Sequence, residues 1–266
     1  MLGVDLSITP GSQSLPQTSE QELFDGGHDG AWYIINPATC FVDHQRTTNA
    51  AVGDRVGGVF DLSGNGNHAT QDTTANKPFL RQESSGHYYL EFEGNGDHMN
   101  TGVFPPAGQG ERYVAAAVDM TPDATRSINH ILHGGQDFAN RAWGLCSRIS
   151  NVNNLSQHYW AASYFSGIPC TDKDVYSVNL TGGTHVYGAE VADLSDTENV
   201  PAAMNTNGAH TTYRLFARVN LGIEFGVGKM YSCFIINRAL TTNEHDTLME
   251  TMMATAGLTP GGGNVT

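Results

Sequence analysis

Apolar and polar residues alternate with a period of two along much of the chain after residue 30. Between residues 87 and 93, Tyr88, Leu90 and Phe92 share one face of an extended chain, and mostly polar side chains share the other. A half-buried strand produces this pattern, because successive side chains point to opposite faces of a sheet. Comparable patterns predict strands at 114–120, 128–133, 142–149, 157–165, 213–219 and 229–237.

Turn-forming residues separate these segments. Gly182 and Gly183 stand between alternating runs at 175–180 and 184–191, which predicts an antiparallel hairpin. The chain holds 31 Gly among its 266 residues, and frequent turns are typical of sandwiches. We therefore expect an all-β fold, an antiparallel jelly-roll β-sandwich in one domain.

One segment near the end of the sequence has helical spacing instead. Thr241 and Glu244 form a capping-box pair, and Gly257 is a suitable stop. Four apolar residues between them recur at helical intervals: Leu248, Met249, Met252 and Met253. Such a stripe normally packs against a core, so we expect a short C-terminal helix lying on the sandwich or its edge.

Three segments show neither the period of two of a strand nor the spacing of a helix. Residues 1–30 are polar and punctuated by proline, which predicts an extended N-terminal arm before a sandwich domain at 31–257 and a tail at 258–266. Such an arm cannot offset its ordering entropy alone, so we hypothesise that neighbouring chains hold it. Residues 193–211 are predicted to form a long polar surface loop.

The charge balance excludes several classes of partner. The chain has 27 acidic against 13 basic residues, a formal net charge of −14, so phosphate backbones repel it and nucleic acid is not an expected partner. It has no run of ~18 apolar residues and no basic stripe, so membrane insertion is not expected. The first seven residues lack the basic and apolar segments of a secretory signal, and none is expected.

The four cysteines, Cys40, Cys146, Cys170 and Cys233, are widely spaced. No two form the Cys-x-x-Cys motif, so they do not indicate a disulfide scaffold. We expect buried free thiols, because a free cysteine packs as a small hydrophobe. One disulfide is left open by the sequence.

Three motifs carry a family resemblance. They are the Asp-Leu-Ser-Gly-Asn-Gly-Asn-His-Ala run at 61–69, Leu-Glu-Phe-Glu-Gly-Asn-Gly-Asp at 90–97, and Gly-Lys-Met-Tyr through Asn-Arg-Ala-Leu-Thr-Thr-Asn-Glu at 228–244. In this order the chain resembles laminin-G-like, concanavalin A-like jelly-roll domains over about residues 31–257. Glu91 and Glu93 depart from the aspartates usual in that pattern.

Two shorter runs, Gly-Ala-Trp-Tyr at 30–33 and Asn-His-Ala-Thr-Gln at 67–71, are similar to bacteriophage structural proteins. This resemblance implies a non-enzymatic virion accessory protein: a capsid decoration, head fibre or tail appendage. It also implies location in the virion after synthesis in the bacterial host cytoplasm, with homo-oligomer formation. The implied partners are the major capsid protein or tail proteins, together with a host surface glycan.

An aromatic cluster in the middle of the chain is the best candidate for ligand contact. Trp143, Tyr159 and Trp160 could stack on the apolar faces of sugars, while Asn153 and Asn154 bond to hydroxyls. The alternative is that the two tryptophans are core residues. Glycan binding outside any particle, by a free lectin, is therefore the alternative function.

A pair of carboxylates suggests a third function. Glu91 and Glu93, at i and i+2 on a strand, are ~6–7 Å apart by strand geometry, which suits acid/base work on a glycoside. The full acidic triad of the glucanases with this fold is missing. Two interpretations are therefore open: the pair belongs to a glycoside hydrolase, or the two glutamates are ordinary surface carboxylates.

Metal chemistry has weak support. The Asp61–His68 loop could bind calcium through its Asp and Asn oxygens, or could be a self-bonded Asx turn whose two glycines adopt positive φ. No cofactor is expected, and calcium is left open. His130 and His133 should lie on opposite faces of a strand, which is poor metal-ligand geometry.

Overall fold

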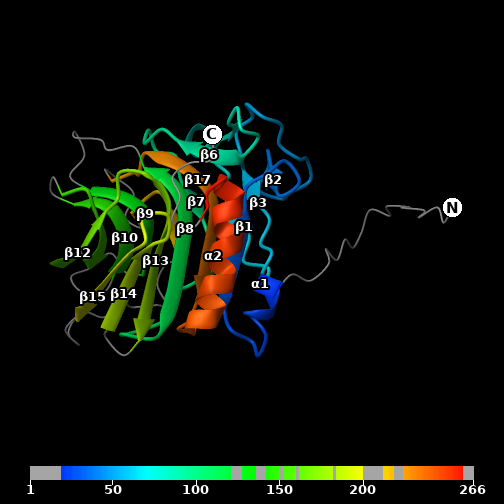
Figure 1. Ribbon diagram of the computed structural model, residues 1–266. Coiled ribbons are helices and arrows are strands. Elements are labelled where there is room, and N and C mark those ends of the chain that lie inside the picture. Colours follow the sequence, from blue (N-terminus) through cyan, green and yellow to red (C-terminus); the bar gives the residue numbers. More distant parts are fainter. Residues whose placement is uncertain are drawn as a thin grey trace.

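The structure is a computed structural model that describes residues 19–120, 128–135, 142–149, 152–159, 162–181, 184–199, 212–218 and 224–259. Within this part of the chain, two antiparallel sheets pack face to face, and helix α2 (Thr242–Ala256) lies on the outer side of one of them (Figure 1). Two short helices complete the helical content of these residues: α1 (Ser19–Glu22) and the 3-10 turn η1 (Thr74–Asn76). The predicted all-β sandwich with a C-terminal helix is confirmed.

The sheet beneath α2, called sheet A, has the strand order β15–β14–β13–β8–β17–β6–β5, with β1 also paired to β17. Its strands are β1 (Gly30–Ile34), β5 (Phe79–Gln82), β6 (Tyr88–Phe92), β8 (Arg112–Met120), β13 (Lys173–Thr181), β14 (Thr184–Ala189), β15 (Leu194–Asn199) and β17 (Gly228–Ile236). Strand β17 pairs with β8 on one side and with β6 and then β1 on the other. It therefore has three paired neighbours in sheet A.

The facing sheet, called sheet B, has the order β12–β11–β10–β9–β16–β7–β4–β3–β2. Its strands are β2 (Cys40–Phe41), β3 (Gly58–Val59), β4 (Ala69–Thr70), β7 (Met99–Asn100), β9 (Ile128–Gly135), β10 (Ala142–Ile149), β11 (Asn154–Tyr159), β12 (Ala162–Pro169) and β16 (Arg214–Leu215). At one edge of the sandwich, β12 of this sheet contacts β15 of sheet A.

Strand β8 of sheet A is buried on both faces, whereas alternation of apolar and polar residues predicts burial of only one face. Its even-numbered residues from Val114 to Met120 enter the core between the sheets, together with Leu90 and Phe92, as predicted. Its odd-numbered residues Tyr113, Ala115 and Ala117 are also buried, because α2 covers them. Sheet A thus separates two hydrophobic layers, one inside the sandwich and one beneath the helix.

Helix α2 begins and ends as its sequence predicts. The Thr241 hydroxyl accepts from the Glu244 N–H, and the Glu244 carboxylate accepts from the Thr241 N–H at 2.8 Å. Gly257 ends the helix in the left-handed region, with φ of 67°. The predicted stripe is buried against sheet A: Leu248, Met249, Met252 and Met253.

The segment 19–30, predicted as part of the arm, packs on the domain. Glu20 is buried and accepts a hydrogen bond from the Thr251 hydroxyl of α2. Phe24 packs against Phe234 of β17, with ring centroids 5.0 Å apart. The rest of the predicted arm, 1–18, lies outside the described residues, as does 260–266 of the predicted tail. Leu258 of that tail is buried beside α2.

Two strand predictions and one loop prediction need correction. The strand predicted at 157–165 is two strands, β11 and β12, paired from Tyr159↔Ala162 onward, and no Gly or Pro between them signals the reversal. Of the strand predicted at 213–219, the structure describes 213–218, and only the two-residue β16 is a strand there. The predicted loop 193–211 begins with β15, a polar edge strand mostly exposed to solvent, where hydrophobic alternation is not required; residues 200–211 lie outside the description.

The remaining expectations concern turns, thiols and membranes. Strands β13 and β14 pair up to Thr181↔Thr184, which confirms the hairpin between them. All four cysteines are buried and free. None of the helices in the described part of the chain has the length and hydrophobicity of a membrane-spanning segment.

Candidate functional site

The predicted sugar-stacking residue Trp143 is fully buried in the core between the sheets. Its indole N–H donates to Gln157 Oε1, and the Arg112 guanidinium lies 5.2 Å from its ring centroid. No face of the ring is open to a ligand, so the prediction that Trp143 stacks on a sugar is wrong. Alternation along β10 points Trp143 into the core. Gln157 accepts the hydrogen bond of the indole N–H, which burial would otherwise leave without a partner.

Two of the other predicted glycan contacts, Asn153 and Asn154, form hydrogen bonds within the protein. Asn154 Nδ2 donates to the Ser166 carbonyl at 2.8 Å, and the Asn153 carbonyl accepts from the Cys170 N–H at 2.9 Å. Both asparagines therefore tie the β11–β12 region together. The side chain of Tyr159 and the whole of Trp160 lie outside the description, so their predicted contact with glycan stays a prediction.

The predicted acid pair also has structural partners. Glu91 forms an ion pair with Arg81 across β5 and β6, with 2.8 Å between Oε2 and Nε. Glu93 is exposed, and its N–H donates to the buried Asp97 carboxylate at 3.0 Å. Burial raises the pKa of Asp97, while the hydrogen bond from Glu93 and the Arg55 charge oppose that rise. Neither Glu91 nor Glu93 lines the pocket described below.

The Asp61–His68 loop is built as an Asx turn. The Asp61 carboxylate accepts from the N–H groups of Trp32, Ser63 and Asn67 at 2.8–2.9 Å and from the Ser63 hydroxyl at 2.8 Å. Gly64 and Gly66 adopt φ of 88° and 75°, which the turn requires. The carboxylate is thus committed to the loop itself. Among the described residues, no group of three or more His, Cys, Asp or Glu is arranged to hold a metal ion.

The prediction that His130 and His133 lie on opposite faces is wrong. Their rings meet edge to face with centroids 5.0 Å apart. The register of β9 against β10 shifts between Leu145 and Cys146, which face Leu132 and His130, so Ile131 is an extra residue. This bulge places both histidines on the same face of β9. His130 contacts Cys146 Sγ at 3.3 Å and lies 3.6 Å from Glu224.

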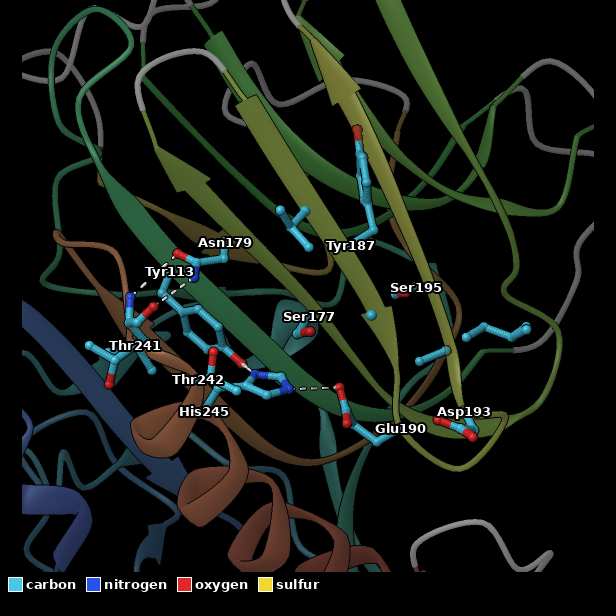
Figure 2. Close-up of a pocket in the computed structure, with 15 residues that line it drawn as sticks. Tyr113, Ser177, Asn179, Tyr187, Glu190, Asp193, Ser195, Thr241, Thr242 and His245 are labelled. Atoms are coloured by element: carbon cyan, nitrogen blue, oxygen red, sulfur yellow. Dashed lines mark hydrogen bonds and ion pairs between the residues drawn. The ribbon is translucent and has the colours of Figure 1, made fainter.

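A pocket of about 270 Å³ opens where α2 leaves part of the outer face of sheet A uncovered (Figure 2). Its walls are the first turn of α2, the segment before it, and strands β13 to β15. Its polar lining includes Tyr113, Ser177, Asn179, Glu190, Asp193 and His245. The size is close to the lower limit of small-ligand pockets.

Strand register and helix capping set the positions of these side chains. Tyr113, on β8, pairs with Asn179, on β13, so the two lie side by side on the outer face. The Asn179 amide donates to the Leu240 carbonyl at 2.9 Å and holds the segment that leads into α2. The capping box then begins the helix so that His245 reaches back over Tyr113.

Two polar contacts in series cross the pocket wall. The Tyr113 hydroxyl lies 2.7 Å from His245 Nδ1, and His245 Nε2 lies 3.3 Å from Glu190 Oε1 (Figure 2). Burial, and secondarily the Glu190 charge, raises the pKa of Tyr113 well above its usual value, so the phenol keeps its proton. The phenol O–H therefore donates to His245 Nδ1, and the other ring nitrogen, Nε2, faces Glu190.

The floor and rim of the pocket differ in character. A Cβ at Gly188 would lie 2.7 Å from Ser177 Oγ and 2.9 Å from Glu190 Oε1, so glycine keeps the floor open. Val186 and Leu194, which are 44% and 43% exposed, provide apolar surface at its edge. Asp193 occupies a turn with φ of 50°, a conformation uncommon for residues other than glycine, asparagine and aspartate.

Sequence reasoning missed this pocket because its residues come from four distant segments. Tyr113 and His245 are 132 positions apart. One local signal existed: Gly188 interrupts an otherwise alternating strand, and such a glycine often marks a close approach of a ligand or another backbone.

A second pocket, near Glu83 and Asp119, has charges that largely compensate one another. Lys173 and the Tyr231 hydroxyl bond to Glu83 at 2.9 and 2.6 Å, and Lys229 bonds to Asp119 at 2.8 Å. Burial alone would raise the pKa of Glu83, but the bonds from Tyr231 and Lys173 lower it overall. This network is adequately explained as a stabilising contact between the sheet and neighbouring loops.

No protein-family model matches the chain, and no curated protein sequence matches it. Among solved structures, domain 4 of AbnA, a GH43 extracellular arabinanase from Geobacillus stearothermophilus in complex with arabinotriose, is similar with a TM-score of 0.54 at 15% identity; 84% of this chain and 98% of that domain are covered. A mutant GH54 α-L-arabinofuranosidase soaked with 4-nitrophenyl α-L-arabinofuranoside is similar with a TM-score of 0.63 at 12% identity. The similarity covers 89% of this chain and 65% of that one.

The binding domain of Paraclostridial Mosquitocidal Protein 1 is similar with a TM-score of 0.51 at 9% identity, over 73% of this chain and 49% of that one. At these identities the similarity establishes the fold. The chain shares its β-sandwich fold with these three structures.

Proposed function

We propose that this protein is a carbohydrate-binding β-sandwich that holds a sugar unit in the pocket between α2 and sheet A. The observation that supports the proposal is the open floor at Gly188, surrounded by a preformed hydrogen-bonding wall of Tyr113, His245 and Glu190. A sugar offers many hydroxyls and one or two apolar C–H faces. The polar wall suits the hydroxyls, and Val186 with Leu194 suits an apolar face.

The similar structures support this class of ligand. The arabinanase domain was solved with arabinotriose, and the arabinofuranosidase was soaked with an arabinofuranoside. The proposed activity is binding without bond cleavage. A glycoside hydrolase is the competing function, and reducing-sugar release from arabinan and other polysaccharides distinguishes the two; we expect none.

The decisive experiment fills the pocket floor. In Gly188→Val, the added side chain meets Ser177 and Glu190 atoms that can move, and valine favours a strand, so the fold should persist. We expect binding to an array of neutral and charged oligosaccharides, arabinotriose included, to fall at least about tenfold, as loss of roughly 1.4 kcal/mol implies.

Thr197→Val is the matched control. It places the same side chain at an exposed position of β15 that does not line the pocket. Retained binding by Gly188→Val, with thermal stability equal to the control, would remove the pocket from consideration. Binding of no glycan by the unmodified protein would overturn the function itself.

The virion role implied by the family resemblance stays a separate proposal about partners and location. None of the similar structures described above is a virion protein. Its test is deletion of residues 1–18 rather than 1–30, because Phe24 belongs to the hydrophobic layer under α2. Full incorporation of the shortened protein into particles would refute anchoring by the arm.

A further inference from the structure

The charges around the pocket are unevenly distributed. Glu190 and Asp193 both line it, from the turn between β14 and β15, and His245 is the only base among the described residues of its lining. Asp246 follows His245 on α2 and its charge also reaches Tyr113. The described lining therefore holds two carboxylates against one imidazole, an excess of negative charge.

Arg238, which lies just before α2, does not compensate this charge. Arg238 holds Glu244 through two hydrogen bonds, at 2.7 and 3.0 Å, and also donates to the Leu23 and Ala239 carbonyls. Its guanidinium is thus committed to the start of α2 and to the α1 segment. The formal net charge of −14 for the whole chain adds a field of the same sign.

We infer that the pocket selects sugars by charge, favouring neutral and amine-bearing rings over rings with a carboxylate or sulfate, and that Glu190 and Asp193 set this selectivity. This inference rests on the proposed function and specifies its ligand class. An ammonium group on a sugar gains a charge-assisted hydrogen bond from either carboxylate. A uronate meets like charge, and the described lining of the pocket holds no arginine or lysine to receive it.

The geometry around Glu190 strengthens the argument. One of its oxygens faces His245 Nε2 at 3.3 Å, and the open floor at Gly188 lies beside the same oxygen. A ligand seated on that floor is therefore in the immediate neighbourhood of the carboxylate, where water screens less than at an exposed surface. Asp193 approaches from the other end of the turn (Figure 2).

The test compares matched ligands in the full chain. Glucose, glucosamine and glucuronate, and the corresponding galactose series, are titrated at pH 7.5 and low salt by ligand-observed NMR and calorimetry. We expect each uronate to bind at least about tenfold more weakly than its neutral counterpart, and each amine to bind as well or better. The difference should shrink at about 1 M salt, because the Debye length falls to ~3 Å.

Charge-neutral variants identify the residues responsible. In Glu190→Gln with Asp193→Asn, the glutamine keeps an acceptor for His245 and the asparagine tolerates the positive φ. The ratio of neutral to uronate affinity should fall towards one. Glu250→Gln, an exposed residue of α2 outside the pocket, removes one charge elsewhere and should leave the ratio unchanged.

The outcomes separate the two proposals. If neutral sugars bind and uronates bind equally well, or if the double variant keeps the original ratio, the charge selectivity is wrong while sugar binding stands. If neither neutral, amine-bearing nor anionic sugars bind, the proposed function is wrong and the selectivity with it.

Discussion

Glu244 connects the stability of the chain to the position of the pocket wall. Its carboxylate accepts from the Arg238 guanidinium at 2.7 and 3.0 Å and from the Thr241 N–H at 2.8 Å. The hydrogen bonds from Arg238, followed by those from Thr241, lower the pKa of Glu244 from 4.5 to about 2. Glu244→Gln keeps the capping acceptor and removes only the charge.

The magnitude follows from linkage. A shift from 4.5 to about 2 corresponds to about 3 kcal/mol of differential stabilisation of the charged form. The side chain is 29% exposed, so solvent screening reduces this to about 1–2 kcal/mol. Because the folded-state pKa is lowered, the contribution is fully present above pH ~4.5 and is lost as pH falls towards ~2.

The assay is urea unfolding of the wild type and Glu244→Gln at pH 7 and pH 3. We expect a difference in the free energy of unfolding of about 1–2 kcal/mol at pH 7 and less than half of that at pH 3. At pH 3, Glu244 takes up a proton when the wild type unfolds, and this uptake favours the unfolded state. Asp246→Asn, an exposed neighbour on the same helix turn, is the control. A difference of equal size at both pH values, or none at pH 7, would refute the reasoning.

Three further predictions test the layer beneath the helix and the core. Leu248→Ala should lower the free energy of unfolding by about 3 kcal/mol, because the side chain is fully buried; a loss under 1 kcal/mol in guanidinium unfolding would contradict its place in the layer. Gly257→Ala should cost about 1–2 kcal/mol, since φ is 67° and the new Cβ would lie 2.4 Å from His87 Nε2; an unchanged melting temperature would count against that geometry. Burial raises the pKa of Cys40 and Cys233 to about 12, so no cysteine should react rapidly with a thiol reagent at pH 8 in the native protein, whereas all four should react in denaturant; fast native labelling would disprove the burial.

The elements that sequence predicts well are those with local causes. The start of α2 depends on Thr241 and Glu244, its end on Gly257, and its buried face on a stripe that repeats every turn. The inward face of β6 follows from simple alternation at Leu90 and Phe92. Each of these signals lies within a few residues of the feature that it specifies.

The features that sequence misses depend on contacts between distant segments. In the sequence, Trp143 resembles a sugar-binding aromatic residue, but in the structure it is buried in the core between the sheets. The bulge at Ile131, which places His130 and His133 on one face, has no signal in the composition of the segment. The pocket is a gap that α2 leaves over the strands beyond it. Its existence depends on where the helix stops covering the sheet, which no single segment determines.

The pairing of β17 with three other strands has a consequence for how the chain reaches its native state. Gly30 finds its partner at Ile236, and Leu90 finds its partner at Met230, so sheet A cannot be completed until residues from both ends of the domain have met. Closing such long loops is entropically costly, and domains rich in distant pairings fold slowly. Fragments that stop before residue 228 should therefore leave β1 and β6 detached from β8, with exposed edges that are open to aggregation.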